Sequence, residues 1–307
     1  MSLQRFDAML FHSSTCLPPN HLPDPMETHL WYLKPGEVKS ESLIKHYFSI
    51  LSPCEKENVL KIQCEELRKN ALLSRILVRT SIARCMYASS SPIDPRTLKF
   101  RRNVYGKPEL DWGFSDDRRL HFNLSHSPSL VACAVKTYSQ VGVDVEDKRR
   151  RIKHGVLSLA GRYFTKHETE FLAAISDPQL QRSEFIKMWT LKESYVKAIG
   201  KGFSGAPFGT FTISYKSTDG ESLLTTENRK DKAFEIAVDS SEMSAGWHFM
   251  LLELANSHFA AICTEKYCGL DGKQKALAKL KVWRTIPYVE DEYVSGTDAV
   301  RVICGFT

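Results

Sequence analysis

The chain has 307 residues, of which 42% are hydrophobic, and a formal net charge of +6. A chain of this length is able to bury one large core or two smaller ones. No apolar run reaches the length needed to cross a bilayer, so we expect a soluble protein that does not associate with membranes. The modest positive charge suits anionic partners without singling out nucleic acid.

The N-terminal region and the cysteines bear on localisation. Residues 1–25 contain four prolines and lack the charged start and apolar core of a secretory signal. Eight cysteines are scattered along the chain with no Cys-x-x-Cys pair, which is typical of a reducing compartment and favours neither zinc nor disulfides. We expect a flexible N-terminal tail over 1–25 and a cytoplasmic protein, with a mitochondrial or other organellar address as the alternative.

The first half of the chain predicts helices followed by short strands. Ser52-Pro53-Cys54-Glu55 has the form of a helix start, with a capping serine, a proline at the first position and an acid three residues on. A long helix over about 68–87 follows, with a buried stripe of Leu72, Leu73, Ile76, Leu77, Thr80 and Ala83. Strands are expected near 98–104, 119–124 and 130–136, with a turn at Tyr105-Gly106-Lys107-Pro108.

The second half predicts a similar mixture. A strand is expected over 141–146, and Thr165-x-x-Glu168 has the form of a capping box that opens a helix. A long helix over about 180–200 is ended by Gly200 and Gly202, residues that tolerate a left-handed backbone. Further strands are expected near 209–215, 233–239, 247–254 and 258–264. We expect only weak order after Glu265.

Two stretches of this half suit a divalent cation and a pyrophosphate. In the predicted strand Val141-Gly-Val-Asp144-Val-Glu146 the valines alternate with Gly142 and the two acids, so both carboxylates lie on one face. In the predicted helix Trp189, Glu193 and Lys197 are spaced four apart and lie along one side. Mg²⁺ typically takes a few carboxylates together with substrate phosphates. A strand with two acids that faces a helix with one acid is a plausible magnesium site.

A third stretch completes a family pattern. Gly106-Lys107-Pro108 is followed by His121-Phe-Asn-Leu-Ser125-His126-Ser127, and then by the strand and helix motifs. The order and spacing resemble the 4′-phosphopantetheinyl transferases, in particular the larger monomeric type that includes the surfactin-synthetase-activating and aminoadipate-semialdehyde-dehydrogenase enzymes. The resemblance extends from about His29 to Cys263.

The resemblance implies an α+β fold with two similar lobes related by a pseudo-twofold axis, each a small antiparallel sheet packed with helices, and an active site between them. On this basis the chain divides into a flexible tail over 1–25, an N-terminal lobe over 26–140 that binds coenzyme A, a C-terminal lobe over 141–265 that binds Mg²⁺ and carries catalysis, and a weakly ordered tail over 266–307.

The activity that the resemblance implies is that of a holo-acyl-carrier-protein synthase. It transfers the 4′-phosphopantetheine arm of coenzyme A to a serine of an apo-acyl carrier protein or aminoadipate-type carrier domain, and it releases adenosine 3′,5′-bisphosphate. The implied metal is Mg²⁺, with Mn²⁺ as an alternative, and its ligands are Asp144, Glu146 and Glu193. Glu193 and Lys197 are the implied catalytic residues, and coenzyme A would contact Arg102, Lys107, Ser125, His126 and Lys197.

Several roles stay open at this point. Glu193 acts as a metal ligand, as the base that accepts the serine proton, or as both through a water. Lys192 matches a family lysine whose role is less certain, and Trp189 is expected to anchor the helix in the core. Asn58 stands where related enzymes often place a basic residue for the 3′-phosphate, which leaves the affinity for coenzyme A open, although Lys56 or Lys61 from a neighbouring turn is a substitute.

The basic run Lys148-Arg-Arg-Arg-Ile-Lys153 follows the metal strand directly. We weigh three interpretations: docking of acidic carrier domains, an ordinary solvated surface, and nucleic-acid binding. The last would need basic residues interleaved with aromatics along one face, and we do not expect it. A non-catalytic module that binds coenzyme A is the other rival, but no acidic ligand of the motifs is missing. We expect the enzyme to act as a monomer.

Overall fold

The computed structural model describes residues 22–86, 93–111, 120–217, 234–239, 246–265 and 279–305. Its first half contains the elements β1 (Glu27–Leu33), α1 (Glu41–Ile50), α2 (Pro53–Leu60), α3 (Glu65–Cys85), β2 (Phe100–Arg102), β3 (Pro108–Leu110), β4 (Leu120–His126) and β5 (Val131–Thr137). Its second half contains β6 (Val141–Asp147), α4 (Val156–Tyr163), α5 (Lys166–Ala173), α6 (Pro178–Ile199), α7 (Gly202–Gly205), β7 (Thr212–Ser217), β8 (Phe234–Asp239), β9 (Trp247–Leu254), β10 (His258–Glu265), β11 (Lys279–Ile286), β12 (Glu290–Tyr293) and β13 (Val300–Gly305).

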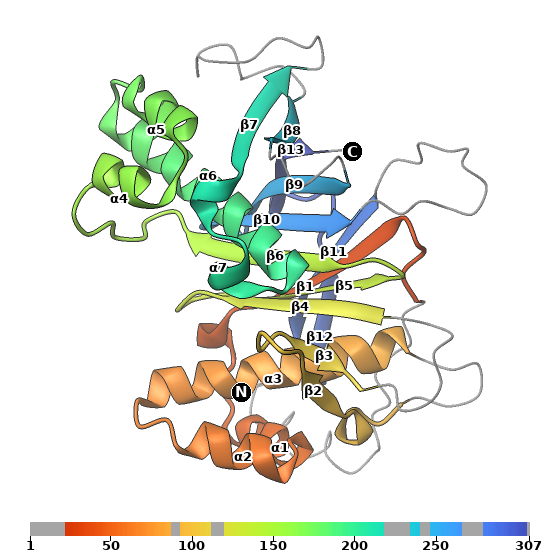
Figure 1. Cartoon of the computed structure of the whole chain (residues 1–307). Helices are drawn as coiled ribbons and strands as arrows, with labels where there is room; N and C mark the ends of the chain where they lie inside the picture. Colours follow the sequence, from red (N-terminus) through yellow and green to blue (C-terminus); the bar gives the residue numbers. More distant parts are fainter. Residues whose placement is uncertain are drawn as a thin grey trace.

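Two β-sheets form the centre of the molecule, with helices on their outer faces (Figure 1). One sheet has the strand order β12-β11-β1-β5-β4, and the other has the order β13-β9-β10-β6. The two short ribbons β2-β3 and β7-β8 complete the pairing. Apart from the parallel pair of β1 with β11, neighbouring strands run antiparallel. The predicted α+β class is confirmed.

The predicted helix signals act as expected. Ser52 caps α2 and forms a reciprocal capping box with Glu55, and Thr165 forms the same arrangement with Glu168 at the start of α5. All six residues of the predicted stripe of α3 are buried. Gly200 ends α6 with φ of +71°, the left-handed conformation expected of a C-terminal glycine. The turn at Gly106 was predicted, whereas the short strand β3 that follows it was not.

Alternation along the strands produces three apolar layers. In β1, Trp31 and Leu33 face the layer beneath α1–α3, whereas Leu30 and Tyr32 face the layer shared by the two sheets. The valines of β6 line that shared layer from the other sheet. A third layer joins the outer face of the second sheet to α6. Among the described residues, no helix combines the length and apolar character that crossing a membrane requires.

The prediction of weak order after residue 265 is wrong for residues 279–305. Strand β11 extends the first sheet by pairing in parallel with β1, with Glu27 opposite Lys279, and β13 pairs with β9 in the second sheet. The C-terminal segment therefore crosses from one sheet to the other. Strands β11 and β13 were missed because their partners β1 and β9 lie far away in the sequence, and β12 pairs in turn with β11.

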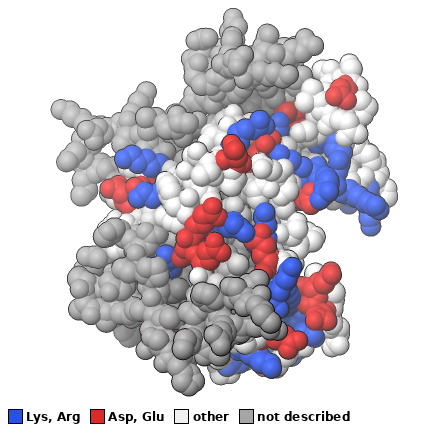
Figure 2. Space-filling view, turned by 180° about the vertical axis from the view of Figure 1, so that it is seen from behind, with Lys and Arg blue, Asp and Glu red and all other residues white. Residues whose placement is uncertain are grey.

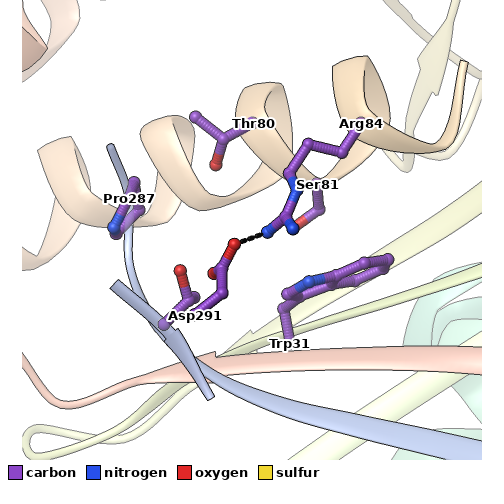
Figure 3. A pocket seen from close by; sticks show the side chains of 7 residues that line it. Trp31, Thr80, Ser81, Arg84, Pro287 and Asp291 are labelled. Carbon is purple, nitrogen blue, oxygen red and sulfur yellow. Dashed lines mark ion pairs between the residues drawn. The ribbon is translucent and has the colours of Figure 1, made fainter. Parts of the chain in front are cut away.

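A small pocket lies between α3 and the hairpin of β11 and β12 (Figure 3). Arg84 reaches from α3 to an ion pair with Asp291, next to the indole of Trp31. The remaining lining residues are Thr80, Ser81, Thr285 and Pro287. The C-terminal hairpin is thus attached to the N-terminal half by a mostly buried charge pair as well as by strand pairing.

Candidate active site

Strand β6 carries the first two predicted metal ligands at the edge of its sheet. Its valines face the shared apolar layer, which turns Gly142, Asp144 and Glu146 toward α6. Helix α6 lies directly on Gly142, where an added Cβ would be 2.0 Å from the carbonyl oxygen of Ser194. Glycine at this position therefore permits the close approach that brings helix and strand residues together.

Helix α6 carries Glu193 and Lys197 on the turns that face β6. The ammonium of Lys197 donates to Oδ1 of Asp144 at 2.7 Å and lies 3.9 Å from Oε1 of Glu193. The predicted grouping of Asp144, Glu193 and Lys197 therefore exists in the structure. Glu146, the remaining predicted ligand, forms an ion pair with Arg150.

The electrostatics of this cluster favour an added cation. Asp144 is 3% exposed, and its Oδ2 atom is buried without a hydrogen-bond partner. Burial and the neighbouring charge of Asp144 raise the pKa of Glu146 to about 7, and the same two causes raise the pKa of Glu193. Carboxylates whose mutual repulsion disfavours ionisation gain stability from a nearby positive charge.

The chemistry of these residues decides whether they suit Mg²⁺. Within the described ranges, no three acidic, histidine or cysteine side chains are gathered closely enough to form a ready-made shell. Lys197 and Arg150 instead supply positive charge to Asp144 and Glu146. The unpartnered oxygen of Asp144 and the acid-rich surroundings match the oxygen preference of Mg²⁺, so the donor set fits this ion.

Ser125 and His126 lie at the end of β4, beside this cluster. The Oγ atom of Ser125 is buried and donates to Oδ1 of Asp144 at 2.9 Å. His126 is exposed at the surface. Partial burial of its ring and the charge of Lys197 lower the pKa of the imidazole, whereas the charge of Asp144 raises it. The structure thus brings both residues to the carboxylates, but only His126 is presented to solvent.

Lys107 is placed differently from the expectation. Its ammonium donates to Oε1 of Gln140 at 3.1 Å and to the carbonyl oxygens of Ala198 and Val141 at 2.9 and 3.4 Å. Burial lowers its pKa to about 8. Since a lysine has three protons to donate and all three are used, this side chain attaches the β2-β3 hairpin to the end of α6 and does not reach toward an open phosphate site.

Two arginines lie near this hairpin: Arg102, which was predicted, is on β2, and Arg75, which was not, is on α3. Arg102 is exposed and donates to the carbonyl of Gly106 at 2.8 Å. Burial, together with the nearby charge of Arg102, lowers the pKa of Arg75 on α3. Arg75 was not singled out from the sequence, although a partly buried arginine on a helix that packs in the core is a candidate for anion binding. Asn58 is exposed and contacts Cys54.

Lys192 has a structural role. It is fully buried, pairs with Glu168 at 2.9 Å and donates to the carbonyl oxygens of Phe208 and Phe211. This network joins α6 to α5 and to the start of β7. Trp189 packs against a cluster of aromatic rings that includes Phe208, as expected of a core anchor.

The basic run is partly neutralised in the fold. Lys148 pairs with Glu253, and Arg149 lies 3.8 Å from Asp147. Arg151 and Lys153 are exposed. Figure 2 shows basic side chains gathered on the flank of the molecule where Figure 1 places α4 and α5. The run therefore leaves a positively charged rim close to the carboxylate cluster.

Comparisons with known proteins agree with this site. Residues 140–263 match the family model of the 4′-phosphopantetheinyl transferase superfamily, and residues 39–138 match the model of the 4′-phosphopantetheinyl transferase N-terminal region. The chain is 33% identical over 196 residues to 4′-phosphopantetheinyl transferase HetI of Nostoc sp., which covers 64% of this chain and 78% of the relative.

Two other relatives show the breadth of the similarity. The chain is 35% identical over 162 residues to 4′-phosphopantetheinyl transferase gsp of Aneurinibacillus migulanus, covering 52% of this chain and 60% of that relative. It is 26% identical over 223 residues to the mouse L-aminoadipate-semialdehyde dehydrogenase-phosphopantetheinyl transferase, covering 71% and 68% respectively. With two matched regions, the second of which contains the strand and helix of the carboxylate cluster, the chain belongs to the 4′-phosphopantetheinyl transferase superfamily.

Proposed function

We propose that this protein transfers the 4′-phosphopantetheine arm of coenzyme A to a serine of an apo-carrier protein in a Mg²⁺-dependent reaction that releases adenosine 3′,5′-bisphosphate. The observation that carries the proposal is the buried, unpartnered Oδ2 of Asp144 beside Glu193 and Lys197. The proposal includes a two-lobed, pseudo-twofold organisation and action as a monomer in the cytoplasm.

Asp144, Glu146 and Glu193 would hold the ion, which supplies charge neutralisation to the pyrophosphate when bound. Transfer of a phosphoryl-type group depends mainly on positioning and charge stabilisation by the protein. Lys197 lies beside the carboxylates and would supply a positive charge to the 5′-phosphate oxygen of the leaving adenosine 3′,5′-bisphosphate. His126, exposed at the end of β4, suits contact with a nucleotide phosphate.

In the chemical step the hydroxyl oxygen of the carrier serine forms a bond to the β-phosphorus, and the bond from that phosphorus to the adenosine bisphosphate oxygen breaks. The serine proton must leave at the same time. Burial and Asp144 raise the pKa of Glu193, whereas a cation held by the same carboxylate would lower it, so we propose that the proton reaches Glu193 through a water. Glu193 is therefore our candidate base.

The carrier is expected to approach along the positively charged rim. Arg151 and Lys153 are exposed there, and Leu157 of α4 is 41% exposed in the following turn. Acidic carrier domains would be steered by the two basic residues, which raises the association rate. We propose acyl-carrier or aminoadipate-type domains as the partner class.

The test is intact-mass analysis of an apo-acyl carrier protein incubated with the protein, coenzyme A and Mg²⁺, with EDTA as control. The proposal predicts a gain of one phosphopantetheine arm that EDTA prevents. Asp144→Asn and Glu193→Gln should lower the rate by more than about 100-fold, since even residues beside metal ligands contribute 10–100-fold. Glu170→Gln, at an exposed position of α5, is the matched control. Transfer at a normal rate by either site variant would contradict the assignment of that carboxylate.

A further inference from the structure

Side chains, not backbone pairing, join the edges of the two sheets beside the carboxylates. Strand β6 is the edge strand of its sheet, with β10 on its other side. The Oδ1 atom of Asn123 accepts from the amide of Val143 at 2.9 Å, and the Oγ atom of Ser125 accepts from the amide of Val145 at 3.2 Å. Asn123 and Ser125 are two residues apart on β4, so they point to the same side.

These contacts fix the register between β4 and β6. An edge strand has a row of backbone amides that need partners when buried, and two buried side chains of β4 satisfy two of them. A shift of one residue along β6 would leave both amides without their partners. The Asp144 carboxylate lies between these two attachment points, at Val143 and Val145.

The hydroxyl of Ser125 has further contacts that use all of its bonding capacity. It donates its proton to Oδ1 of Asp144 at 2.9 Å, and it accepts from the ammonium of Lys197 at 2.9 Å as well as from the amide of Val145. A hydroxyl has one proton to donate and two lone pairs with which to accept. In this arrangement the hydroxyl has no proton and no lone pair left for a phosphate oxygen. This differs from the contact with coenzyme A that the family resemblance implies for Ser125.

We propose that Ser125 is a positioning residue for the metal ligand Asp144. Ser125 and Lys197 both bind Oδ1 of this carboxylate, which leaves Oδ2 as the buried oxygen without a partner. The serine thus holds the carboxylate in the orientation in which Oδ2 is available to the cation. This inference rests on the proposed function, and it assigns recognition of the nucleotide phosphate to His126 alone within the Ser125-His126 pair.

Direct metal binding tests the inference without reference to catalysis. Titration of the protein with Mn²⁺, followed by the electron paramagnetic resonance signal of the free ion, should show 10–100-fold weaker binding for Ser125→Ala, as for other residues that orient metal ligands. Ser125→Thr, which keeps the hydroxyl, should recover most of the affinity. The control is Ser127→Ala, because Ser127 is a buried hydroxyl of the same motif that contacts His258 and not the carboxylates.

A second measurement separates positioning from phosphate recognition. The ratio of kcat/KM for coenzyme A to that for dephospho-coenzyme A should be unchanged in Ser125→Ala and lowered in His126→Ala. Unchanged Mn²⁺ affinity in Ser125→Ala, or a fall in this ratio, would overturn the proposal. If the wild-type protein fails to modify any carrier, the proposed function fails, whereas the Mn²⁺ titration still decides the role of Ser125. If Ser125→Ala does not fold, Ser125→Cys provides the same two measurements.

Discussion

Replacement of Gly142 by alanine tests whether the close packing of α6 on β6 assembles the site. A Cβ at this position would lie 2.0 Å from the carbonyl oxygen of Ser194 and 2.3 Å from the backbone nitrogen of Ala198. Both contacts are with helix backbone, so no side-chain rotation relieves them. Restoring an ordinary contact requires the helix to move away from the strand by about 1.4 Å.

That displacement has a direct effect on the carboxylate cluster. Lys197 and Asp144 are joined across the same interface by a bond of 2.7 Å, which a shift of this size would break. A misplacement of about 1 Å is able to lower a rate by about 100-fold. We therefore expect kcat/KM to fall by about 100-fold or more. Overpacking should also lower the free energy of unfolding by about 1–3 kcal/mol.

The assay is transfer to an apo-carrier at varied carrier concentration and saturating coenzyme A, combined with urea unfolding. Gly161→Ala is the matched control, since this glycine lies on the exposed side of α4 with nothing near its Cβ position. The control should retain full activity and gain up to about 1 kcal/mol of stability from helix propensity. A Gly142→Ala variant with normal kcat/KM would refute the view that glycine is needed here to bring α6 onto β6.

Two further predictions concern the N-terminal half and its attachment to the C-terminal hairpin. Burial lowers the pKa of His29 to about 4, so the folded protein excludes a proton that the unfolded chain binds below about pH 6.5. The free energy of unfolding therefore falls by about 3 kcal/mol as the pH falls from 6.5 toward 4. In His29→Phe, the urea midpoints at pH 7 and pH 4.5 should differ less than they do in the wild type. An equal difference in the variant and the wild type would count against a buried neutral imidazole. Asp291→Ala leaves the mostly buried Arg84 without its carboxylate and should lower the free energy of unfolding by about 3 kcal/mol, whereas Glu292→Ala at an exposed position should lower it by less than about 1 kcal/mol. Equal effects of the two substitutions in urea unfolding would show that burial does not set the value of the Arg84 pair.

Local patterns account for most of what was predictable from the sequence. Alternation in β6 and the spacing of four in α6 are properties of neighbouring residues, and these placed Asp144, Glu193 and Lys197 on the correct faces. The capping boxes at Ser52 and Thr165 were equally local. These signals need no knowledge of how distant segments meet.

What the sequence did not reveal depends on those distant segments. Lys107 carries a charge suited to a phosphate, but its ammonium is enclosed by carbonyls that come from β6 and α6. Ser125 was assigned to the ligand by the family resemblance, and its contact with Asp144 arises only when β4 lies against β6. The strand at 279–286 does show alternation, with Leu280 and Val282 between polar residues, but its partner β1 lies about 250 residues earlier.

The parallel pairing of β1 with β11 has a consequence for synthesis on the ribosome. Glu27 and Lys279 face each other in the sheet, so one side of β1 has no strand beside it until about 250 further residues have been made. At roughly 5–20 residues per second this interval lasts about 10–50 s. An uncovered strand edge is a template for pairing with other chains. The nascent protein therefore has a defined period in which chaperones compete with aggregation, and it ends only when the C-terminal segment emerges.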